Sequence, residues 1–505
     1  MDALPYIIDG FKVAFQLHNI MFVFIGALLG TIVGLIPGIG AMAGIALLLP
    51  LTYGLEPVSA LIMLCGIYYG SNYGHTAAAV LINTPGDGTA VVTAFDGYPM
   101  ARNGRGGAAL AAAAIASFAG GTISVVALTF LAVPLSRVAL HFGPAENFML
   151  MFFAISAVSA FTGSSVPKAM FSLLFGLMLA TIGIDLQSGQ DRFTFGSPRL
   201  MEGIPFLSVV VGFFALTEVI RQVQAWHTGE LKPIKISGRL WFTAEEWRRM
   251  PGPMMRGGII GFLIGILPGA GGVIATIISY ATEKKLSKHP EKFGTGMIEG
   301  VAAPESSNNA CVSGALAPLL TLGIPGSGVT ALLLGGFIMY GVQPGPQLMQ
   351  EHPDLVWGLI DSMYLGNIIL LILNLPLIGL FVRILYLPPG ILLTGILATA
   401  VTGIYSVNTN IAELYFALGF AVVGHYFRKA KIPVAPLILG IVLGGLMEQA
   451  FRQGMTISGG NPLIFLASTP CIILALMAIG SLMAPVFGML FKRWRAGSST
   501  TAAGA

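Results

Sequence analysis

Charged residues are scarce in this sequence. Asp, Glu, Lys and Arg together occupy 10% of its 505 positions, whereas a soluble domain carries roughly 25%. Hydrophobic residues occupy 55%, and the mean hydropathy is +0.83. These values exclude a water-soluble globular chain. The net charge of +4 is small, and no basic tract with interleaved aromatic residues is present, which argues against nucleic-acid binding.

Cysteine is also scarce, and the common catalytic motifs are missing. Cys65, Cys311 and Cys471 are far apart and form no CxxC pair, so we expect neither a disulfide framework nor a zinc site. No Gly-Lys-Ser or Gly-Lys-Thr follows a glycine loop, and the loose dinucleotide match at Gly38-x-Gly40-x-x-Ala43 has no strand before it. Because no catalytic constellation converges, we expect that the protein is not an enzyme. An intramembrane enzyme is the weakest alternative.

Apolar stretches of membrane-spanning length recur along the whole chain. In hydrocarbon every backbone polar group needs an internal partner, so these stretches are predicted to be helices. We therefore expect an all-α polytopic membrane protein with about 11–12 transmembrane segments. The stretches lie at residues 20–36, 41–53, 57–82, 108–133, 145–161, 166–184, 204–222, 256–267, 270–282, 297–322, 327–341, 356–382, 388–402, 408–424, 433–448 and 465–491.

A polar stretch divides the chain into two membrane parts. We predict a first membrane repeat at 10–222, a cytoplasmic loop at 223–255 and a second membrane repeat at 256–448. An additional C-terminal transmembrane helix is expected at 465–491, and a disordered tail at 496–505. The loop is rich in Lys and Arg, which marks the cytoplasmic side. Its Trp241 and Trp247 suit an interfacial helix. The N-terminus lacks the pattern of a cleaved signal peptide.

The two membrane parts share two motifs in the same order. Gly34-Leu-Ile-Pro-Gly-Ile-Gly40 recurs 231 residues later as Gly265-Ile-Leu-Pro-Gly-Ala-Gly271. Thr84-Pro-Gly-Asp-Gly88 recurs 240 residues later as Ile324-Pro-Gly-Ser-Gly328. The change of offset places an insertion in the second half, around Lys284–Gly294. Paired motifs at these spacings predict an internal repeat.

The basic residues favour repeats of opposite orientation. Arg248 and Arg256 precede the second proline-glycine loop, and Lys284 and Lys292 follow it. If both flanks are cytoplasmic, the segment between them enters and leaves on one side as a hairpin. Following the basic loops outward from there places the first hairpin on the opposite side. Inverted repeats of this kind recur among secondary transporters.

Four proline-glycine breaks interrupt the apolar stretches, at Pro37, Pro85, Pro268 and Pro325. Proline removes a backbone donor, and glycine lets the chain leave helical geometry. Such breaks at membrane depth are tolerated only where they are buried in protein or line a wet cavity. They predict a binding site, although close helix packing is the plainer explanation for any one of them. The predicted gating hairpins contain Pro37, Gly38, Gly40, Pro268, Gly269 and Gly271.

Polar clusters accompany the breaks. Asn83-Thr-Pro-Gly-Asp-Gly88 offers oxygen ligands and free backbone, and Pro304-Glu-Ser-Ser-Asn-Asn309 precedes the last break. Asp87 is costly in hydrocarbon unless it lies in an exposed loop, and the serines and asparagines can also simply bond between helices. His75 is the least specific of these residues. The predicted substrate- and ion-binding residues are Ser71, Asn72, Asn83, Thr84, Pro85, Gly86, Asp87, Gly88, Ser307, Asn308, Asn309, Gly323, Pro325, Gly326, Ser327 and Gly328.

With these motifs the chain resembles the large membrane subunit of the tripartite tricarboxylate transporter family, essentially over its whole length. The resemblance implies a multi-pass permease of the bacterial inner membrane. It also implies a small four-helix membrane subunit and a periplasmic solute-binding protein as partners. It implies no cofactor, and Na⁺ or H⁺ as the coupling ion. Members transport citrate or other carboxylates, so the substrate does not carry over.

The hypothesis that follows is ion-gradient-driven uptake of a tricarboxylate or related organic anion. Backbone N–H groups near Pro85 and Pro325 would hold carboxylates, and the hairpins would gate the two sides. Oxygens of Asn83, Thr84, Asn308 and Ser327 would hold Na⁺ or substrate. The alternative is a channel or exporter for organic anions that needs no binding protein. Loops near 137–144 and 343–355 are candidate docking sites for the binding protein.

Overall fold

The protein is helical almost throughout its described part. The computed structural model describes residues 3–36, 38–161, 165–185, 188–226, 241–381, 383–384 and 387–483. Within these residues, six helical stretches are long and apolar enough to cross a membrane, by length and composition, and several shorter apolar helices accompany them. The prediction of an all-α polytopic membrane protein is therefore confirmed. Pro37, most of the polar loop and the C-terminal tail lie outside the described residues.

The chain forms two compact units. Unit 1 contains Met1–Leu140 and Pro205–Tyr426, and unit 2 contains His141–Ile204 and Phe427–Ala505. Each unit therefore draws on both of the halves expected from the sequence. The units are defined by contacts and the halves by internal similarity, so the repeat boundaries stay a prediction.

The N-terminal part of unit 1 contains two helices that lie outside the predicted apolar stretches. These are α1 and α5, which are short and carry polar residues. The α-helices here are α1 (Ala3–Ala14), α2 (Leu17–Leu35), α3 (Ala41–Leu48), α4 (Pro57–Ile82), α5 (Val91–Met100) and α6 (Gly106–Ala139). The 3₁₀ segments η1 (Leu49–Thr52) and η2 (Gly88–Ala90) and the π segment η3 (Ala101–Arg105) lie between them.

The rest of unit 1 begins with a helix that contains a π segment, η5 (Val211–Leu216), and ends within α20. The α-helices are α9 (Phe206–Val210), α10 (Thr217–Trp226), α11 (Ala244–Arg249), α12 (Pro251–Ile266), α13 (Gly271–Leu286), α14 (Glu299–Leu322), α15 (Gly328–Met339), α16 (Leu348–Glu351), α17 (Pro353–Asn374), α18 (Ile378–Phe381), α19 (Pro389–Asn408) and α20 (Ile411–Lys429). The 3₁₀ segment η6 is Pro290–Lys292.

The helix predicted beside the two loop tryptophans is α11. Thr243 caps it through a reciprocal box in which the Thr243 side chain accepts from the Glu246 N–H and the Glu246 carboxylate accepts from the Thr243 N–H. Trp241 and Trp247 are about half exposed, at 53% and 46%. A short capped helix with exposed indoles fits the membrane interface.

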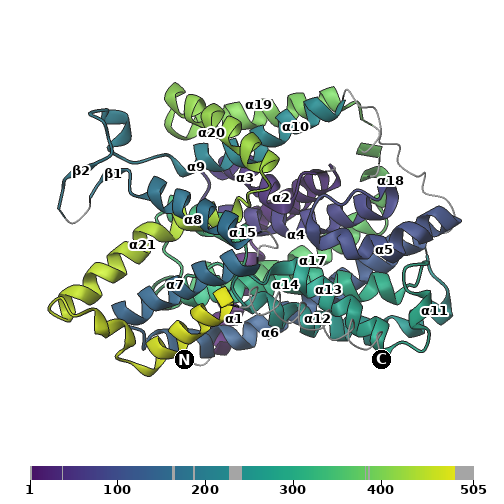
Figure 1. Ribbon diagram of the computed structural model, residues 1–505. Helices are drawn as coiled ribbons and strands as arrows, with labels where there is room; N and C mark the ends of the chain where they lie inside the picture. Colours follow the sequence, from purple (N-terminus) through teal and green to yellow (C-terminus); the bar gives the residue numbers. More distant parts are fainter. Residues whose placement is uncertain are drawn as a thin grey trace, which may run out of the picture. The chain divides into compact units, whose positions relative to one another are not determined.

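Two helix pairs in unit 1 pack through rows of glycine. Figure 1 shows α2 beside α4 and α12 beside α14. A Cβ at Gly30 of α2 would lie 2.3 Å from the Ile67 carbonyl oxygen of α4, and a Cβ at Gly261 of α12 would lie 2.2 Å from the Ser307 oxygen of α14. Such close backbone approach requires glycine. The contacting residues are Gly26, Gly30 and Gly34 with Met63, Ile67 and Ser71, and Gly257, Gly261 and Gly265 with Ala303, Ser307 and Cys311.

The α2–α4 pair and the α12–α14 pair are related by the same sequence offsets, 231 and 240 residues, as the repeated motifs. The α2 and α12 glycines are 231 residues apart, and their carbonyl partners on α4 and α14 are 240 residues apart. The offset changes between α13 and α14, where the connection Ser287–Ile298 is longer than Tyr53–Glu56, which precedes α4. The opposite orientation of the two halves stays a prediction.

The long connection before α14 is held by one carboxylate. Asp96 of α5 accepts hydrogen bonds from the backbone N–H groups of Gly294, Gly296 and Met297, at 2.8–2.9 Å, through a single oxygen. Its other oxygen accepts from the Tyr280 hydroxyl. Asp96 is fully buried and satisfied, so its function is to order this loop against α5.

Unit 2 is built around α21. It contains α7 (Pro144–Phe161), α8 (Val166–Ala180), α21 (Ala435–Ile457) and the antiparallel strands β1 (Gly183–Ile184) and β2 (Asp191–Arg192). The 3₁₀ segments η4 (Pro198–Leu200) and η8 (Pro462–Leu466) complete it, with a helix at Thr469–Met483. α21 contacts both α7 and α8. The helix expected over 166–184 ends early, because Gly183 has a φ of +126° and begins β1 instead.

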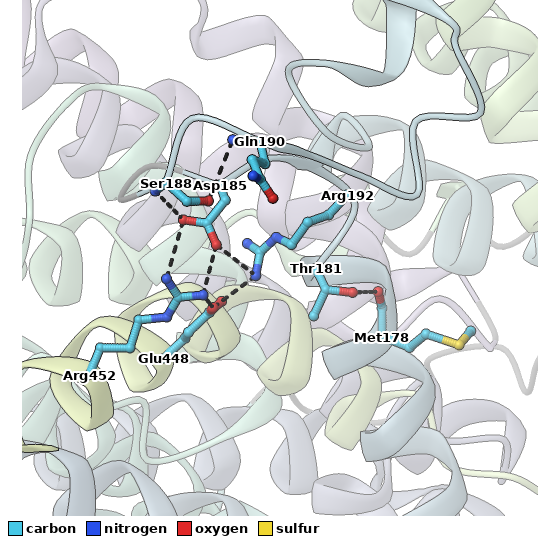
Figure 2. A network of polar contacts seen from close by, with 8 residues as sticks. All are labelled: Met178, Thr181, Asp185, Ser188, Gln190, Arg192, Glu448 and Arg452. Carbon is cyan, nitrogen blue, oxygen red and sulfur yellow. Dashed lines mark hydrogen bonds and ion pairs between the residues drawn. The ribbon is translucent and has the colours of Figure 1, made fainter. Parts of the chain in front are cut away.

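Four charged side chains fasten the β-hairpin to α21 (Figure 2). Arg452 donates to the Asp185 carboxylate at 2.7 Å, and Arg192 donates to Glu448 at 2.8 Å. Arg452 and Glu448 also form an ion pair one turn apart on α21. Asp185 is the buried member, and two guanidinium groups compensate it, so the network is balanced in charge.

Candidate functional site

The first predicted break is a real interruption between two helices. α4 ends at Ile82, and Asn83 follows in the left-handed conformation with a φ of 52°. After Pro85-Gly86 the chain restarts at Asp87, whose side chain accepts from the Thr89 N–H at 3.4 Å and caps η2. Asn83 is exposed, whereas the residues from Thr84 to Thr89 are half-buried.

The second break has the same construction. α14 ends at Leu322, and Gly323 follows with a φ of 71°. Ser327 caps α15 in a reciprocal box with Thr330. Pro325 and Gly326 are buried, unlike their counterparts in the first break. η2 and α15 therefore each begin at the end of a break. The first break is more accessible than the second.

The two predicted hairpins are also present in the backbone. The turn between α2 and α3 contains Gly38, with a φ of 83°, and Gly40. The turn between α12 and α13 contains Gly269, which has a φ of 80°, and the buried Pro268, and α13 begins at Gly271, which has a φ of 62°. Pro37 lies outside the described residues. Positive φ values of this size are accessible to glycine at little cost, which explains the glycines at these turns.

Each hairpin packs on the break of its own half. A Cβ at Gly86 would lie 3.2 Å from the carbonyl oxygens of Gly34 and Ile39. In the second half, the Gly269 N–H donates to the Gly326 oxygen at 3.0 Å. A Cβ at Gly326 would lie 2.9 Å from the Gly265 oxygen, the counterpart of Gly34. Backbone therefore lies close to backbone at both breaks, where an added side chain would need its neighbours to move.

The second hairpin also reaches the loop of the first half. A Cβ at Gly272 would lie 2.7 Å from the Thr89 methyl carbon and 3.5 Å from the Asn308 amide oxygen. A Cβ at Gly88 would lie 3.0 Å from the Val273 side chain. The first break, the second hairpin and the polar segment of α14 thus converge at one place in unit 1.

Buried polar atoms without partners gather around this convergence. Among the described residues, both ring nitrogens of His75 lack a hydrogen-bond partner, and a Cβ at Gly86 would lie 2.8 Å from its ring. The same holds for Thr89 Oγ1 and Asn308 Nδ2, which flank the second hairpin. Ser307 Oγ and Asn309 Oδ1, on either side of Asn308 in α14, are also unpartnered. Proteins rarely leave such groups unsatisfied, so the cluster is prepared for a polar ligand or water.

Some predicted ligands are instead occupied within their own helix or turn. Ser71 donates to the Tyr68 carbonyl at 2.8 Å, and its own carbonyl oxygen lies against Gly34, so it serves the packing of α2 on α4. Thr84 donates to the Ile82 carbonyl at 3.2 Å. Asn72 is buried on α4. The hydroxyls of Ser71 and Thr84 are therefore used within the fold, whereas Thr89 Oγ1 and Asn308 Nδ2 beside the second hairpin have no partner.

Two charged residues near the site were not among the binding residues predicted from the sequence. Glu305 lies one turn before Asn308 and Asn309 on α14 and is fully buried. Arg221 of α10 pairs with Glu218, and a Cβ at Gly38 would clash with its guanidinium. Glu305 stands inside the polar Pro304–Asn309 motif, which was the available signal. Arg221 follows an apolar run and resembles an ordinary interfacial arginine in the sequence.

Comparison with known proteins agrees with this architecture. The sequence model of the tripartite tricarboxylate transporter TctA family matches residues 20–439, which include all four breaks. An uncharacterized 52.8 kDa protein in the TAR-I ttuC' 3'region of Agrobacterium vitis is 46% identical over 480 residues, 95% of each chain. An uncharacterized protein in the TAR-II ttuC' 3'region of the same organism is 45% identical over 227 residues, 43% of this chain and 94% of that relative. No solved structure matches the chain. The chain is a multi-pass membrane protein that belongs to the tripartite tricarboxylate transporter TctA family.

Proposed function

We propose that this chain is the permease subunit of a secondary transporter that takes up a tricarboxylate or related organic anion across the bacterial inner membrane. An Na⁺ or H⁺ gradient drives the uptake, and a periplasmic solute-binding protein and a small four-helix membrane subunit act with the chain. The observation that carries the proposal is the convergence of broken helices on buried, unpartnered polar atoms, in a chain of this family. Secondary transporters bind substrates at discontinuous helices of this kind.

The substrate's carboxylates are held by backbone N–H groups at the two breaks. A helix N-terminus carries free N–H donors and a partial positive charge, which suits an anion. η2 leads directly into α5, and α15 begins at Gly328, so each half offers one such terminus. Thr89 and Asn308 supply side-chain hydrogen bonds between them.

The hairpins act as gates in this scheme. The tip at Gly269 is bonded to Gly326, and the tip at Gly40 lies 3.2 Å, measured from a built Cβ, from the Asp87 carboxylate. A movement of either tip would open its break to one side of the membrane.

The test is uptake of labelled citrate into proteoliposomes that contain the chain with its two partner subunits. Wild-type uptake is expected to require both the ion gradient and the binding protein. Gly326→Ala and Gly86→Ala should reduce it strongly, because each added methyl group meets backbone or the His75 ring. Gly395→Ala on α19 is the matched control, since nothing lies within 4 Å of that position.

The outcomes separate the alternatives. Normal uptake by both break variants, with protein of normal stability, would refute the site. Uptake that needs neither a gradient nor the binding protein would favour the channel or exporter. Absence of citrate uptake under an intact gradient would direct the same assay to other carboxylates.

A further inference from the structure

Glu305 lies in a cage of hydroxyl groups. Thr76 of α4 donates to its carboxylate at 2.7 Å, and Ser117 of α6 donates to the same oxygen at 3.2 Å. Thr93 of α5 donates to the other oxygen. The three donors come from three helices of the first half of the chain, and Glu305 comes from the second. Glu305 is fully buried, as are Thr93 and Ser117, with at most 1% of each residue exposed.

No cation compensates this carboxylate within the described residues. Three other buried or partly buried acids of unit 1 are compensated by cations or by backbone donors. Glu283 and Glu299 form ion pairs with Arg256 and Arg249, and Asp96 is bonded by three backbone N–H groups. Glu305 has hydroxyl donors only. An ionised carboxylate without a countercharge is costly inside a membrane protein, so a proton or a bound cation is needed there.

A small cavity adjoins the carboxylate. Its lining includes Glu305, Thr76, Ser117, Tyr73 and Asn374, and its volume of about 10 Å³ is the space of one water molecule or one small ion. The Asn374 amide donates to the Leu370 carbonyl, but its oxygen has no partner among the described residues. Asn374 is only 3% exposed. An unused carbonyl-type oxygen therefore lines the same cavity as the unpaired carboxylate.

We propose that this cavity binds a monovalent cation of the size of Na⁺, held by Glu305, the Asn374 amide oxygen and the hydroxyls of Thr76 and Ser117. Carboxylate, hydroxyl and amide oxygens are hard ligands that suit such ions. One carboxylate supplies a single charge, whereas divalent ions are held by more acidic groups.

In the proposed transporter, this site would bind the coupling ion. That role rests on the proposed function. The site lies one helical turn from Asn308 and Asn309, and its ligands come from α4, α6, α14 and α17, so an ion there joins both halves beside the breaks. The position 240 residues before Glu305 is Cys65, which cannot replace a carboxylate. The second half alone therefore supplies the charge, and the site occurs once.

The experiment measures thermal unfolding of the purified full-length chain in detergent, without partners or substrate. NaCl is titrated against choline chloride at constant ionic strength, and KCl is titrated in parallel. NaCl is expected to raise the melting temperature, because a ligand of the folded state stabilises it by mass action. KCl should act at least several-fold more weakly. Direct binding of ²²Na⁺ to the same protein provides the second measurement.

Variants locate the ion. Glu305→Gln should abolish both the NaCl shift and ²²Na⁺ binding. Asn374→Ala and Ser117→Ala, which keep the charge, should weaken the apparent affinity for Na⁺ by roughly ten-fold each, as expected for loss of one ligand to a charged group. Asp361→Asn is the matched control, because Asp361 is another buried acid without a hydrogen-bond partner among the described residues. It should retain the full NaCl shift.

Several outcomes would overturn the proposal. These are a wild-type melting temperature that does not respond to NaCl, equal shifts with NaCl, KCl and choline chloride, or loss of the shift in Asp361→Asn with retention in Glu305→Gln. If Glu305→Gln does not fold, unchanged Na⁺ affinity in Asn374→Ala and Ser117→Ala overturns it as well. Because the assay uses no substrate, it is independent of the proposed uptake. Na⁺ binding without uptake of citrate or of any other carboxylate tested would count against the transport proposal only.

Discussion

The backbone N–H of Gly269 donates a 3.0 Å hydrogen bond to the carbonyl oxygen of Gly326. This bond joins the tip of one helical hairpin to the break between α14 and α15, two segments that the sequence separates by more than fifty residues. In the first half, Gly86 lies against the Gly34 and Ile39 carbonyls in the corresponding way. Hairpin and break form one substructure in each half, and several predictions depend on it.

The first prediction concerns access to the place where the first break, the second hairpin and α14 meet. Thr89→Cys should react with a small water-soluble thiol reagent, and carboxylate substrate should slow the reaction several-fold. Thr89 is only half-buried beside the second hairpin, so a small reagent can reach this position and a bound anion would cover it. The measurement is the labelling rate in membranes with and without citrate. The native cysteines are buried and provide a low background. Labelling that substrate leaves unchanged would place the site elsewhere.

The second prediction concerns the glycine rows. Gly30→Ala and Gly261→Ala should each destabilise the protein by about 1–3 kcal/mol, the usual cost of overpacking. Their added methyl groups would lie 2.3 and 2.2 Å from carbonyl oxygens, and backbone cannot move aside easily. Thermal unfolding in detergent measures the effect. Gly419→Ala on α20 is the control, since its neighbourhood is open, and a similar loss there would show that the rows are not special.

The third prediction concerns the ion network of unit 2. Arg452→Ala should loosen the β-hairpin, because Asp185 is buried and would lose one of its two guanidinium partners. Hydrogen exchange should then rise at Gly183–Ile184 and Asp191–Arg192. Arg452→Lys should have a smaller effect, since lysine keeps the charge but cannot bond Asp185 and Glu448 through a planar fork. Equal exchange in Arg452→Ala and wild type would contradict the role given to the network.

The fourth prediction concerns acid sensitivity of α11. Burial alone would raise the pKa of Glu246, but hydrogen bonds from Thr243 and Arg105 outweigh it and hold the pKa below the ordinary value of 4.5. A depressed pKa contributes stability above pH 4.5 that is lost as the pH falls through the folded-state pKa. Trp247 fluorescence should therefore change on acidification below that value. Glu246→Gln should remove this transition, and its persistence would assign it to another group.

The membrane class, the helical content and the four breaks follow from the sequence because they depend on local chemistry. Apolar runs must become helices in hydrocarbon, and Pro-Gly pairs must interrupt them. The ends of α4 at Ile82 and of α14 at Leu322 agree with the predicted segments. The glycine rows follow the same offsets as the motifs, which is why a repeat is visible without a structure.

Other features needed the tertiary structure, because they join residues far apart in the chain. Glu305 meets Thr76, Thr93 and Ser117 across 188 to 229 residues, and no spacing rule brings those hydroxyls to that carboxylate. In the sequence, Ser71 and Ser307 are equally good candidates for a binding site. In the structure, the Ser71 hydroxyl is bonded within α4, whereas the Ser307 hydroxyl has no partner. Sequence alone determined where the helices had to break. Packing decided which buried polar groups were left without a partner, because hydrogen-bond satisfaction depends on every neighbour in space.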